Sequence, residues 1–131
     1  MNIYTGLDGN IMRLLFVCVG NSCRSQMAEG IARSLGHTAD SAGTHPAENI
    51  AANAVVVLNA RGISSEGMKP KNVDDFSAED YDMVISMGCG VNCPLMRIDE
   101  DWGLEDPVGQ HLRVYEATAD EIERRLRMLD A

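Results

Sequence analysis

The segment that most constrains the fold begins near the N-terminus with the apolar run Leu14–Val17. Such a continuous run is typical of a short strand that is buried on both faces. Gly20 and Asn21 then break the pattern, and apolar residues recur at helical spacing over about 25–35, where Gly36 follows. This stretch therefore predicts a buried strand, a tight turn and an amphipathic helix.

The rest of the chain continues this alternation of strand and helix. Further strands are predicted at 38–42 and 82–87, with a fourth at 95–98, and further helices at 46–60 and 114–129. This order predicts an α/β domain with a parallel sheet. Ligands of such sheets bind beyond the carboxyl ends of the strands, and the turn after the first strand lies at such an end.

Length and composition favour one domain with its own core. The chain has 131 residues, of which 45% are hydrophobic and 24% are charged, and domains typically contain about 100–200 residues. We assign residues 13–131 to a single catalytic domain. Residues 1–12 contain turn-forming residues and little periodicity, so we predict that they form a flexible N-terminal leader.

The charge excludes several classes of partner. Lys and Arg total 11 while Asp and Glu total 20, which gives a formal net charge of −9. Nucleic acids and anionic membranes need a cationic face, so we expect neither as a partner. The sequence shows neither a secretory segment nor an apolar run long enough for a membrane span. We therefore expect a cytoplasmic monomer whose cysteines serve catalysis, redox chemistry or metal binding.

The turn after the first strand has the composition of an oxyanion-binding loop. Five residues separate Cys18 from Arg24, and they can curl so that their backbone N–H groups point inward. The N-terminus of the following helix adds positive potential. Gly20 can take a positive φ, and Asn21 tolerates one. The predicted oxyanion ligands are Val19, Gly20, Asn21, Ser22, Cys23 and Arg24.

The same loop supplies a nucleophile. Arg24 presents a planar fork that can hold two oxygens of the anion. Cys18 lies at the base of the positive field, which favours its thiolate form, and Ser25 is placed to hydrogen-bond its sulfur. Because a thiolate beneath a bound oxyanion can attack a phosphorus-like centre, we predict that Cys18, Arg24 and Ser25 are catalytic.

These motifs resemble those of a known superfamily. The phosphate-binding loop and first helix of the low-molecular-weight protein tyrosine phosphatases are similar to CVGNSCRSQMAEGIAR, which starts at Cys18. The resemblance is greatest to the thioredoxin-coupled arsenate reductases of that superfamily, and it includes SAGT at 41–44 and DWGLEDPVGQ at 101–110. It implies a three-layer α/β/α fold with a central four-stranded parallel sheet. It also implies reduction of arsenate to arsenite with no bound cofactor.

The resemblance assigns the general acid to Asp106. Pro107 disfavours helical geometry at the residue before it, so the carboxyl group is presented from an extended or turn backbone. In the superfamily, an Asp-Pro at this place donates the proton that the leaving oxygen needs. Glu105 is the competing carboxylate, and spacing alone leaves that alternative open.

Two further cysteines, Cys89 and Cys93, follow the third predicted strand and should emerge at the same end of the sheet as the loop. Gly88 and Gly90 beside them allow movement. In a helical or turned segment, cysteines four positions apart can reach the Cα separation of a disulfide.

The resemblance implies a relay through these thiols. Cys18 attacks arsenic, Cys89 attacks Cys18 and releases arsenite, and Cys93 then attacks Cys89. An external thiol reduces the resulting disulfide. Only three residues separate Cys89 from Cys93, fewer than in the best-known members, which leaves thioredoxin, glutaredoxin and another thiol system as possible reductants.

Two other functions fit part of the pattern. A phosphatase on the same fold would use Cys18, Arg24 and Asp106 and ignore the second cysteine pair. Against it, residues 108–110 lack the tyrosines with which these phosphatases clamp an aromatic substrate. A zinc module would use all four cysteines, although the gaps of four and three residues are wider than structural zinc sites favour. The simpler expectation for Cys23 is a side chain that points into the core.

No metal site is predicted. Asn21, Glu29 and Ser41 match part of a potassium site found in some members, but Lys69 and Lys71 supply cations where an acid would be needed. The histidines lack metal-ligand spacing and are expected to be surface or capping residues: His37, His45 and His111.

Overall fold

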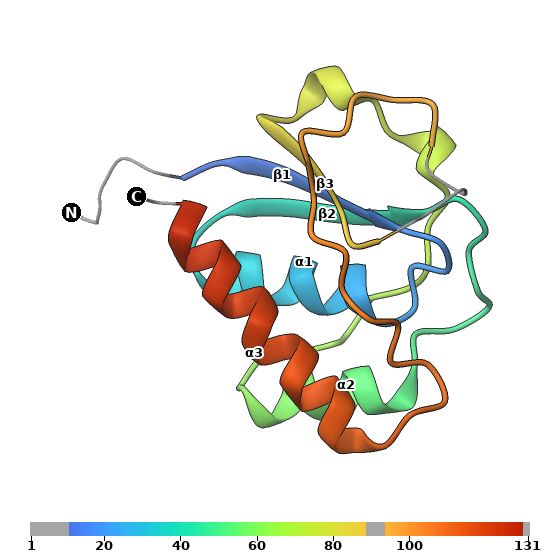
Figure 1. Ribbon diagram of the computed structural model, residues 1–131, viewed down its shortest axis with the longest axis vertical. Helices are drawn as coiled ribbons and strands as arrows, with labels where there is room; N and C mark the ends of the chain where they lie inside the picture. The colour runs from blue at the N-terminus through green and yellow to red at the C-terminus, as the bar shows by residue number, and fades with distance from the viewer. Residues whose placement is uncertain (1–10, 89–93, 130–131) are drawn as a thin grey trace.

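The computed structural model describes residues 11–88 and 94–129 and has the predicted α/β order (Figure 1). Its strands are β1 (Arg13–Cys18), β2 (Thr38–Gly43), β3 (Met83–Ser86) and β4 (Glu100–Asp101). Its helices are α1 (Arg24–Ser34), α2 (Ala52–Ala60) and α3 (Leu112–Leu129), with short 3₁₀ helices η1 (Val73–Asp75) and η2 (Ala78–Asp80).

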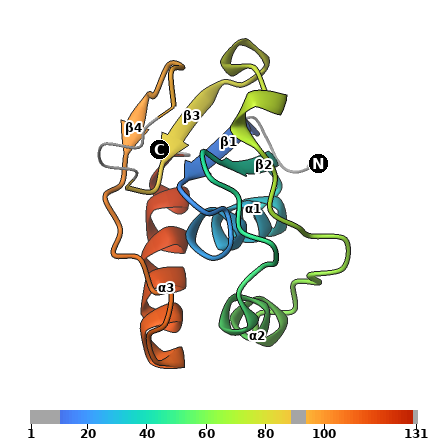
Figure 2. The ribbon, with the colours of Figure 1, turned by 90° about the vertical axis from the view of Figure 1, so that its right-hand side faces the viewer.

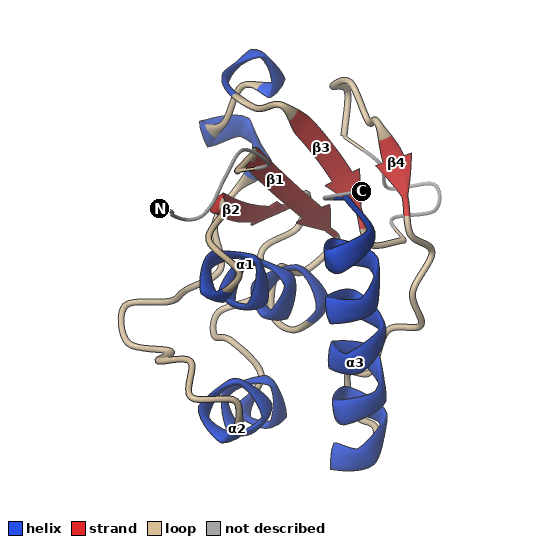
Figure 3. Ribbon diagram, turned by 90° about the vertical axis from the view of Figure 1, so that its left-hand side faces the viewer, coloured by secondary structure: helices blue, strands red, loops and turns tan. Residues whose placement is uncertain are grey.

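The strands form one parallel sheet with the order β2-β1-β3-β4 (Figure 3). The register pairs Cys18 with Gly43 and Val17 with Ser86. The carboxyl ends of the three longer strands therefore meet at one edge, and the residues that follow them lie close together.

The sheet lies between two layers. Helices α1, α2 and α3 cover one face, whereas η1, η2 and the segment 94–99 lie over the other (Figure 2). Along β1, Leu14 and Phe16 pack under the helices, while Leu15 and Val17 pack on the opposite side with Val84. All of them are fully buried, which explains why the sequence of β1 is a continuous apolar run. The predicted four-stranded parallel sheet and three-layer arrangement are confirmed.

The second helix begins later than its sequence predicts. The expected start was residue 46, but α2 starts at Ala52. The segment before it is fastened to the turn after β1 by backbone hydrogen bonds: the amides of His45, Ala47 and Ala51 donate to the carbonyl groups of Val19, Gly20 and Ser22 at 2.8–2.9 Å. Because these amides are engaged with the loop, the backbone from 46 to 51 is not helical.

The fourth strand also differs from its prediction. It covers Glu100–Asp101 and not 95–98. The turn before it is held by Asp99, whose carboxylate accepts a hydrogen bond from the amide of Val84 at 2.8 Å. Met96 and Ile98 pack against the second face of the sheet, whereas Leu95 is fully exposed. Apolar alternation at 95–98 therefore marks a covering segment and not a strand.

The residue just before β1 makes two contacts with the rest of the domain. Met12, which the sequence places in the leader, donates its amide to Nδ1 of His37 at 3.0 Å and packs against the main core. His37 is buried, so of the two expectations for it, a surface or a capping residue, the surface position is wrong. Within the described ranges, no helix has the length and apolar character needed to cross a membrane.

Candidate active site

The turn between β1 and α1 forms a closed loop at the carboxyl edge of the sheet, as predicted. Asn21 has a φ of 51°, whereas Gly20 does not adopt a positive φ. Of the two residues to which the sequence allows this conformation, Asn21 is the one that adopts it. Asparagine tolerates left-handed geometry better than most residues because its short amide bonds locally.

The side chain of Asn21 is fully buried and joins three segments. Its Nδ2 donates to Ser25 Oγ at 2.7 Å. Its Oδ1 accepts from Gln26 Nε2 at 3.1 Å and from the backbone amide of Lys71 at 2.8 Å. These contacts hold the residue in its left-handed conformation. The sequence analysis did not identify Gln26, whose signal is a polar side chain within the buried surface of an amphipathic helix.

Gly43 explains part of the SAGT motif. A Cβ atom there would lie 2.5 Å from the carbonyl oxygen of Val19 and 3.0 Å from the amide nitrogen of Asn21. Both obstacles are backbone atoms, so they cannot move aside without deforming the loop. A glycine at the end of β2 is therefore needed for β2 to approach the loop this closely.

Cys18 lies at the base of the loop and is buried. Its Sγ accepts a hydrogen bond from the amide of Asn21 at 3.2 Å and lies 2.8 Å from Ser25 Oγ, as predicted. Since Asn21 Nδ2 already donates to Ser25 Oγ, the serine hydrogen is available to the sulfur. Both donors stabilise negative charge on Cys18.

Arg24 is buried and connects the loop to the ends of two other segments. Its Nη1 donates to the carbonyl oxygens of Met87, Gly88 and Leu104 at 3.0–3.2 Å. Its Nη2 lies 3.7 Å from Asp106 Oδ2. The Nε is buried and has no partner within the described part of the chain. That donor is available to an oxyanion in the loop, which fits the predicted ligand role.

Asp106 is brought to the loop from the segment after β4. The amides of Trp102 and Leu104 donate to the carbonyl groups of Ser86 and Met87 at 2.8 and 3.0 Å, which fastens this segment to the end of β3. The Asp106 side chain remains 54% exposed. Glu105 is also exposed, but the contacts with the loop are made by Asp106.

Cys23 is the last residue before α1 and, as expected, its side chain is buried in the core. Its Sγ lies 3.6 Å from Asp106 Oδ1. Burial, with a further contribution from the negative charge of Asp106, raises the pKa of Cys23 to about 12. Cys23 is therefore a neutral thiol at neutral pH. Burial also raises the pKa of Tyr115, and Cys23 and Asp106 add to that effect.

A second buried charge lies behind the loop. Glu29 accepts a hydrogen bond from Ser41 Oγ at 2.6 Å and lies near Arg33 Nη2 at 3.1 Å and Lys71 Nζ at 3.4 Å. The ammonium group of Lys71 thus lies beside the carboxylate where the resemblance would put a metal cation. That charge is the reason why no potassium site is predicted from the sequence.

Cys89 and Cys93 lie outside the described residues, so the predicted relay and the four-cysteine zinc alternative remain predictions. Among residues 11–88 and 94–129, no group of three His, Cys, Asp or Glu side chains is placed to hold a metal ion. Cys18 and Cys23 are free thiols.

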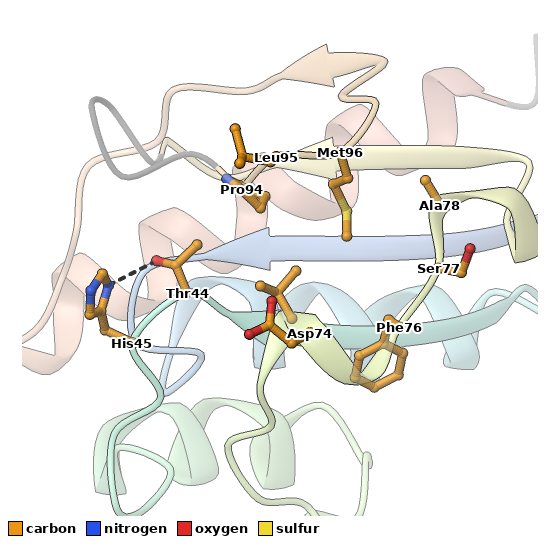
Figure 4. A pocket seen from close by; sticks show the side chains of 10 residues that line it. Thr44, His45, Asp74, Phe76, Ser77, Ala78, Pro94, Leu95 and Met96 are labelled. Atoms are coloured by element: carbon orange, nitrogen blue, oxygen red, sulfur yellow. Dashed lines mark hydrogen bonds between the residues drawn. The ribbon is translucent and has the colours of Figure 1, made fainter.

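A separate hollow of about 560 Å³ lies beside the loop, on the face of the sheet that carries η1. Leu95 and Met96 line one side of it and Asp74 and Phe76 the other, while Thr44 and His45 form the end nearest the loop (Figure 4). The carboxylate of Asp74 in this lining suits an oxyanion poorly, because like charges repel. The loop is therefore the better anion site.

Comparison with known proteins agrees with this geometry. A glutaredoxin arsenate reductase from Synechocystis is 40% identical over 132 residues, which cover 91% of this chain and 96% of that protein. The structure of an arsenate reductase in the phosphate binding state has a TM-score of 0.82 and 39% identity, covering 92% of this chain and 97% of that one.

A phosphatase lies in the same group of relatives. The low molecular weight protein tyrosine phosphatase from T. tengcongensis has a TM-score of 0.73 and 33% identity, covering 90% of this chain and 97% of that one. Residues 13–131 match the family described as low molecular weight phosphotyrosine protein phosphatase. The chain belongs to the low molecular weight phosphotyrosine protein phosphatase family.

Proposed function

We propose that this protein is an arsenate reductase that converts arsenate to arsenite through the thiol of Cys18. The observation that carries the proposal is the arrangement around one loop: a buried sulfur with two donors, a buried guanidinium Nε without a partner, and a carboxyl group within reach. These groups can act as the nucleophile, the anion-binding donor and the acid in an attack on a tetrahedral oxyanion. The arsenate reductases among its relatives favour arsenate as that oxyanion.

In the first step, the Cys18 thiolate forms a bond to arsenic(V). One arsenic–oxygen bond breaks, and Asp106 gives its proton to the departing oxygen, which leaves as water. The backbone amides of the loop and the side chain of Arg24 hold the remaining oxygens. Arsenic is still pentavalent in this thiol-bound adduct, so the two electrons must come from a second thiol.

In the second step, the Cys89 thiolate attacks Cys18 Sγ. The electron pair of the sulfur–arsenic bond passes to arsenic, which leaves as arsenite, and a Cys18–Cys89 disulfide remains. Cys93 then attacks Cys89 and releases the Cys18 thiolate. The Cys89–Cys93 disulfide holds the two oxidising equivalents until an external dithiol accepts them by exchange.

The proposal also includes the identity of the external reductant. A relative at 40% identity is named a glutaredoxin arsenate reductase, which favours glutaredoxin over the thioredoxin that the resemblance suggests. We place the reaction in the cytoplasm, where both thiol systems keep cysteines reduced, and we propose that a monomer carries it out.

A phosphatase is the second candidate, and one observation favours it. Cys18, Arg24 and Asp106 would hydrolyse a phosphomonoester without any contribution from Cys89 or Cys93, and a relative at 33% identity is a tyrosine phosphatase. Against this, Val108 and Gly109 stand directly after the Asp-Pro pair, so no aromatic clamp follows it. We expect phosphatase activity to be a weak side reaction.

Two assays on the purified full chain separate the candidates: arsenate reduction coupled to glutaredoxin or thioredoxin, and hydrolysis of 4-nitrophenyl phosphate. Cys89→Ser should abolish arsenate reduction and leave hydrolysis intact. Cys18→Ser should abolish both. Hydrolysis without arsenate reduction in the wild-type protein would establish the phosphatase and reject the reductase. Full arsenate reduction by Cys89→Ser would reject the relay.

A further inference from the structure

We propose that Cys23 is a positioning residue for Asp106, and that it holds one carboxyl oxygen so that the other, Oδ2, delivers the proton to the departing oxygen. The inference rests on the proposed role of Asp106 as general acid and adds a residue to it. The sequence analysis gave the Cys23 side chain no part in the chemistry.

The two oxygens of Asp106 have different surroundings. Oδ1 lies 3.6 Å from Cys23 Sγ and accepts the amide hydrogen of Val108 at 3.1 Å. Both neighbours are donors, so a proton on Oδ1 would be directed at another hydrogen. Oδ2 lies on the side of the loop, 3.7 Å from Arg24 Nη2, which is too far for a hydrogen bond, and it accepts none from the described residues. The proton of the neutral acid therefore belongs on Oδ2.

Cys23 can keep this role through turnover because it stays protonated. The residue is 3% exposed, and burial holds its pKa far above neutrality. After proton transfer, Asp106 is a carboxylate whose Oδ1 still has both donors, while Cys23 retains its own hydrogen. Proton count is thus conserved: one proton moves from Oδ2 to the leaving oxygen, and none moves from sulfur.

The thiol of Cys23 fixes the Asp106 carboxyl group relative to the loop, which the local turn at Asp106 cannot do. Val108 lies two residues from Asp106, so its amide fixes the carboxyl group only relative to its own segment. Cys23 belongs to the loop that holds the anion, at the start of α1. Because the Asp106 side chain is 54% exposed, loss of the thiol would let the carboxyl group rotate toward solvent. A thiol is a weak donor, so we expect a moderate effect.

The test is a double-mutant cycle on the full chain, measured by arsenate reduction and by 4-nitrophenyl phosphate hydrolysis. Cys23→Ala should lower kcat about three- to tenfold, as expected for loss of one hydrogen bond, and leave the Kd for inorganic phosphate within about twofold. Cys23→Ser, which restores a donor, should recover most of kcat. In an Asp106→Asn background, Cys23→Ala should have no further effect on kcat.

Each contrary result is informative. A serine variant as slow as the alanine variant, or equal slowing by Cys23→Ala in both backgrounds, would overturn the positioning role. Ile31→Val is the matched packing control, because Ile31 is buried in the same cluster and lies on the helix that follows Cys23. It should lower the melting temperature without lowering kcat. Failure of wild-type arsenate reduction would reject only the proposed substrate, since the cycle can still be read from phosphate ester hydrolysis.

Discussion

The Sγ of Cys18 and the Oγ of Ser25 lie 2.8 Å apart, and both side chains are buried. The pair joins the end of β1 to the first turn of α1. Asn21 donates to the same serine oxygen at 2.7 Å, which directs the serine hydrogen toward the sulfur. The loop conformation, the hydroxyl orientation and the charge on the sulfur are therefore linked through one asparagine.

The first prediction concerns this hydroxyl. Ser25→Ala should slow turnover and the alkylation of Cys18 by iodoacetamide at pH 7 by about 10–100-fold, because a hydrogen bond to a charged group contributes about 1.5–3 kcal/mol. Ser34→Ala, on the same helix but bonded to the carbonyl of Ile31, should change neither rate. An alkylation rate at the wild-type level in Ser25→Ala would show that the sulfur does not depend on this donor.

The second prediction concerns Gly43. Gly43→Ala should lower the free energy of unfolding by about 1–3 kcal/mol, as overpacking does, since its Cβ would approach the carbonyl of Val19 to 2.5 Å. Phosphate affinity should fall as well because the loop must deform. Gly20→Ala is the matched control for stability: the nearest atom to its Cβ is Ser22 Oγ at 3.6 Å. Urea unfolding of the two variants measures the difference, and equal loss in both would contradict the packing account.

The third prediction concerns alkaline pH. Burial and the charge of Asp106 raise the pKa of Cys23 to about 12 from 9.0. Above pH 9 the unfolded chain loses this proton while the folded chain keeps it, so stability falls between about pH 9 and pH 12, by up to about 1.4 kcal/mol per pH unit. Burial also raises the pKa of Tyr81 and Tyr115, which adds to the fall. In Cys23→Ala the part of the Tyr115 shift that comes from Cys23 is lost together with the thiol.

Urea unfolding at pH 8, 9.5 and 10.5 isolates the part due to the thiol. The free energy of unfolding should fall less steeply with pH in Cys23→Ala than in the wild type. Parallel curves for the two proteins would mean that Cys23 titrates alike in the folded and unfolded chains.

The fourth prediction concerns the charge behind the loop. Lys71→Met should lower the free energy of unfolding by about 1–3 kcal/mol, because it removes one cation from the buried carboxylate of Glu29 while Arg33 remains. The wild-type melting temperature should be the same in KCl and NaCl at equal ionic strength. A rise specific to potassium would show that the ammonium group does not occupy the cation position.

Much of the fold follows from local sequence patterns. The apolar run in β1 is buried on both faces, and the Cys18–Arg24 spacing gives a loop at the carboxyl edge. Local patterns do not predict where an element begins when its backbone amides form hydrogen bonds with a distant segment. Pro46 is a good helix start, yet the amides after it bond to the loop, so α2 begins at Ala52.

The candidate site, too, could be predicted from the sequence only in part. Cys18, Arg24 and Ser25 could be predicted from the spacing within one short motif, whereas Asp106 was assigned through the resemblance to the superfamily. The structure brings all four to one loop. The support of Asn21 by Gln26 and by the amide of Lys71 could not be predicted, because it depends on contacts across as many as 50 residues. The thiol contact of Cys23 with Asp106 spans 83 residues and leaves no local signal.

The most direct test of the proposed reaction is a single turnover without an external reductant. Fully reduced protein mixed with excess arsenate should form one arsenite per chain and then stop, and mass spectrometry after peptide digestion should find a Cys89–Cys93 disulfide. Cys18→Ser should form no arsenite, and Cys93→Ser should stop with a Cys18–Cys89 disulfide. Absence of arsenite from the wild-type protein, or arsenite formed while all four cysteines remain reduced, would contradict the account.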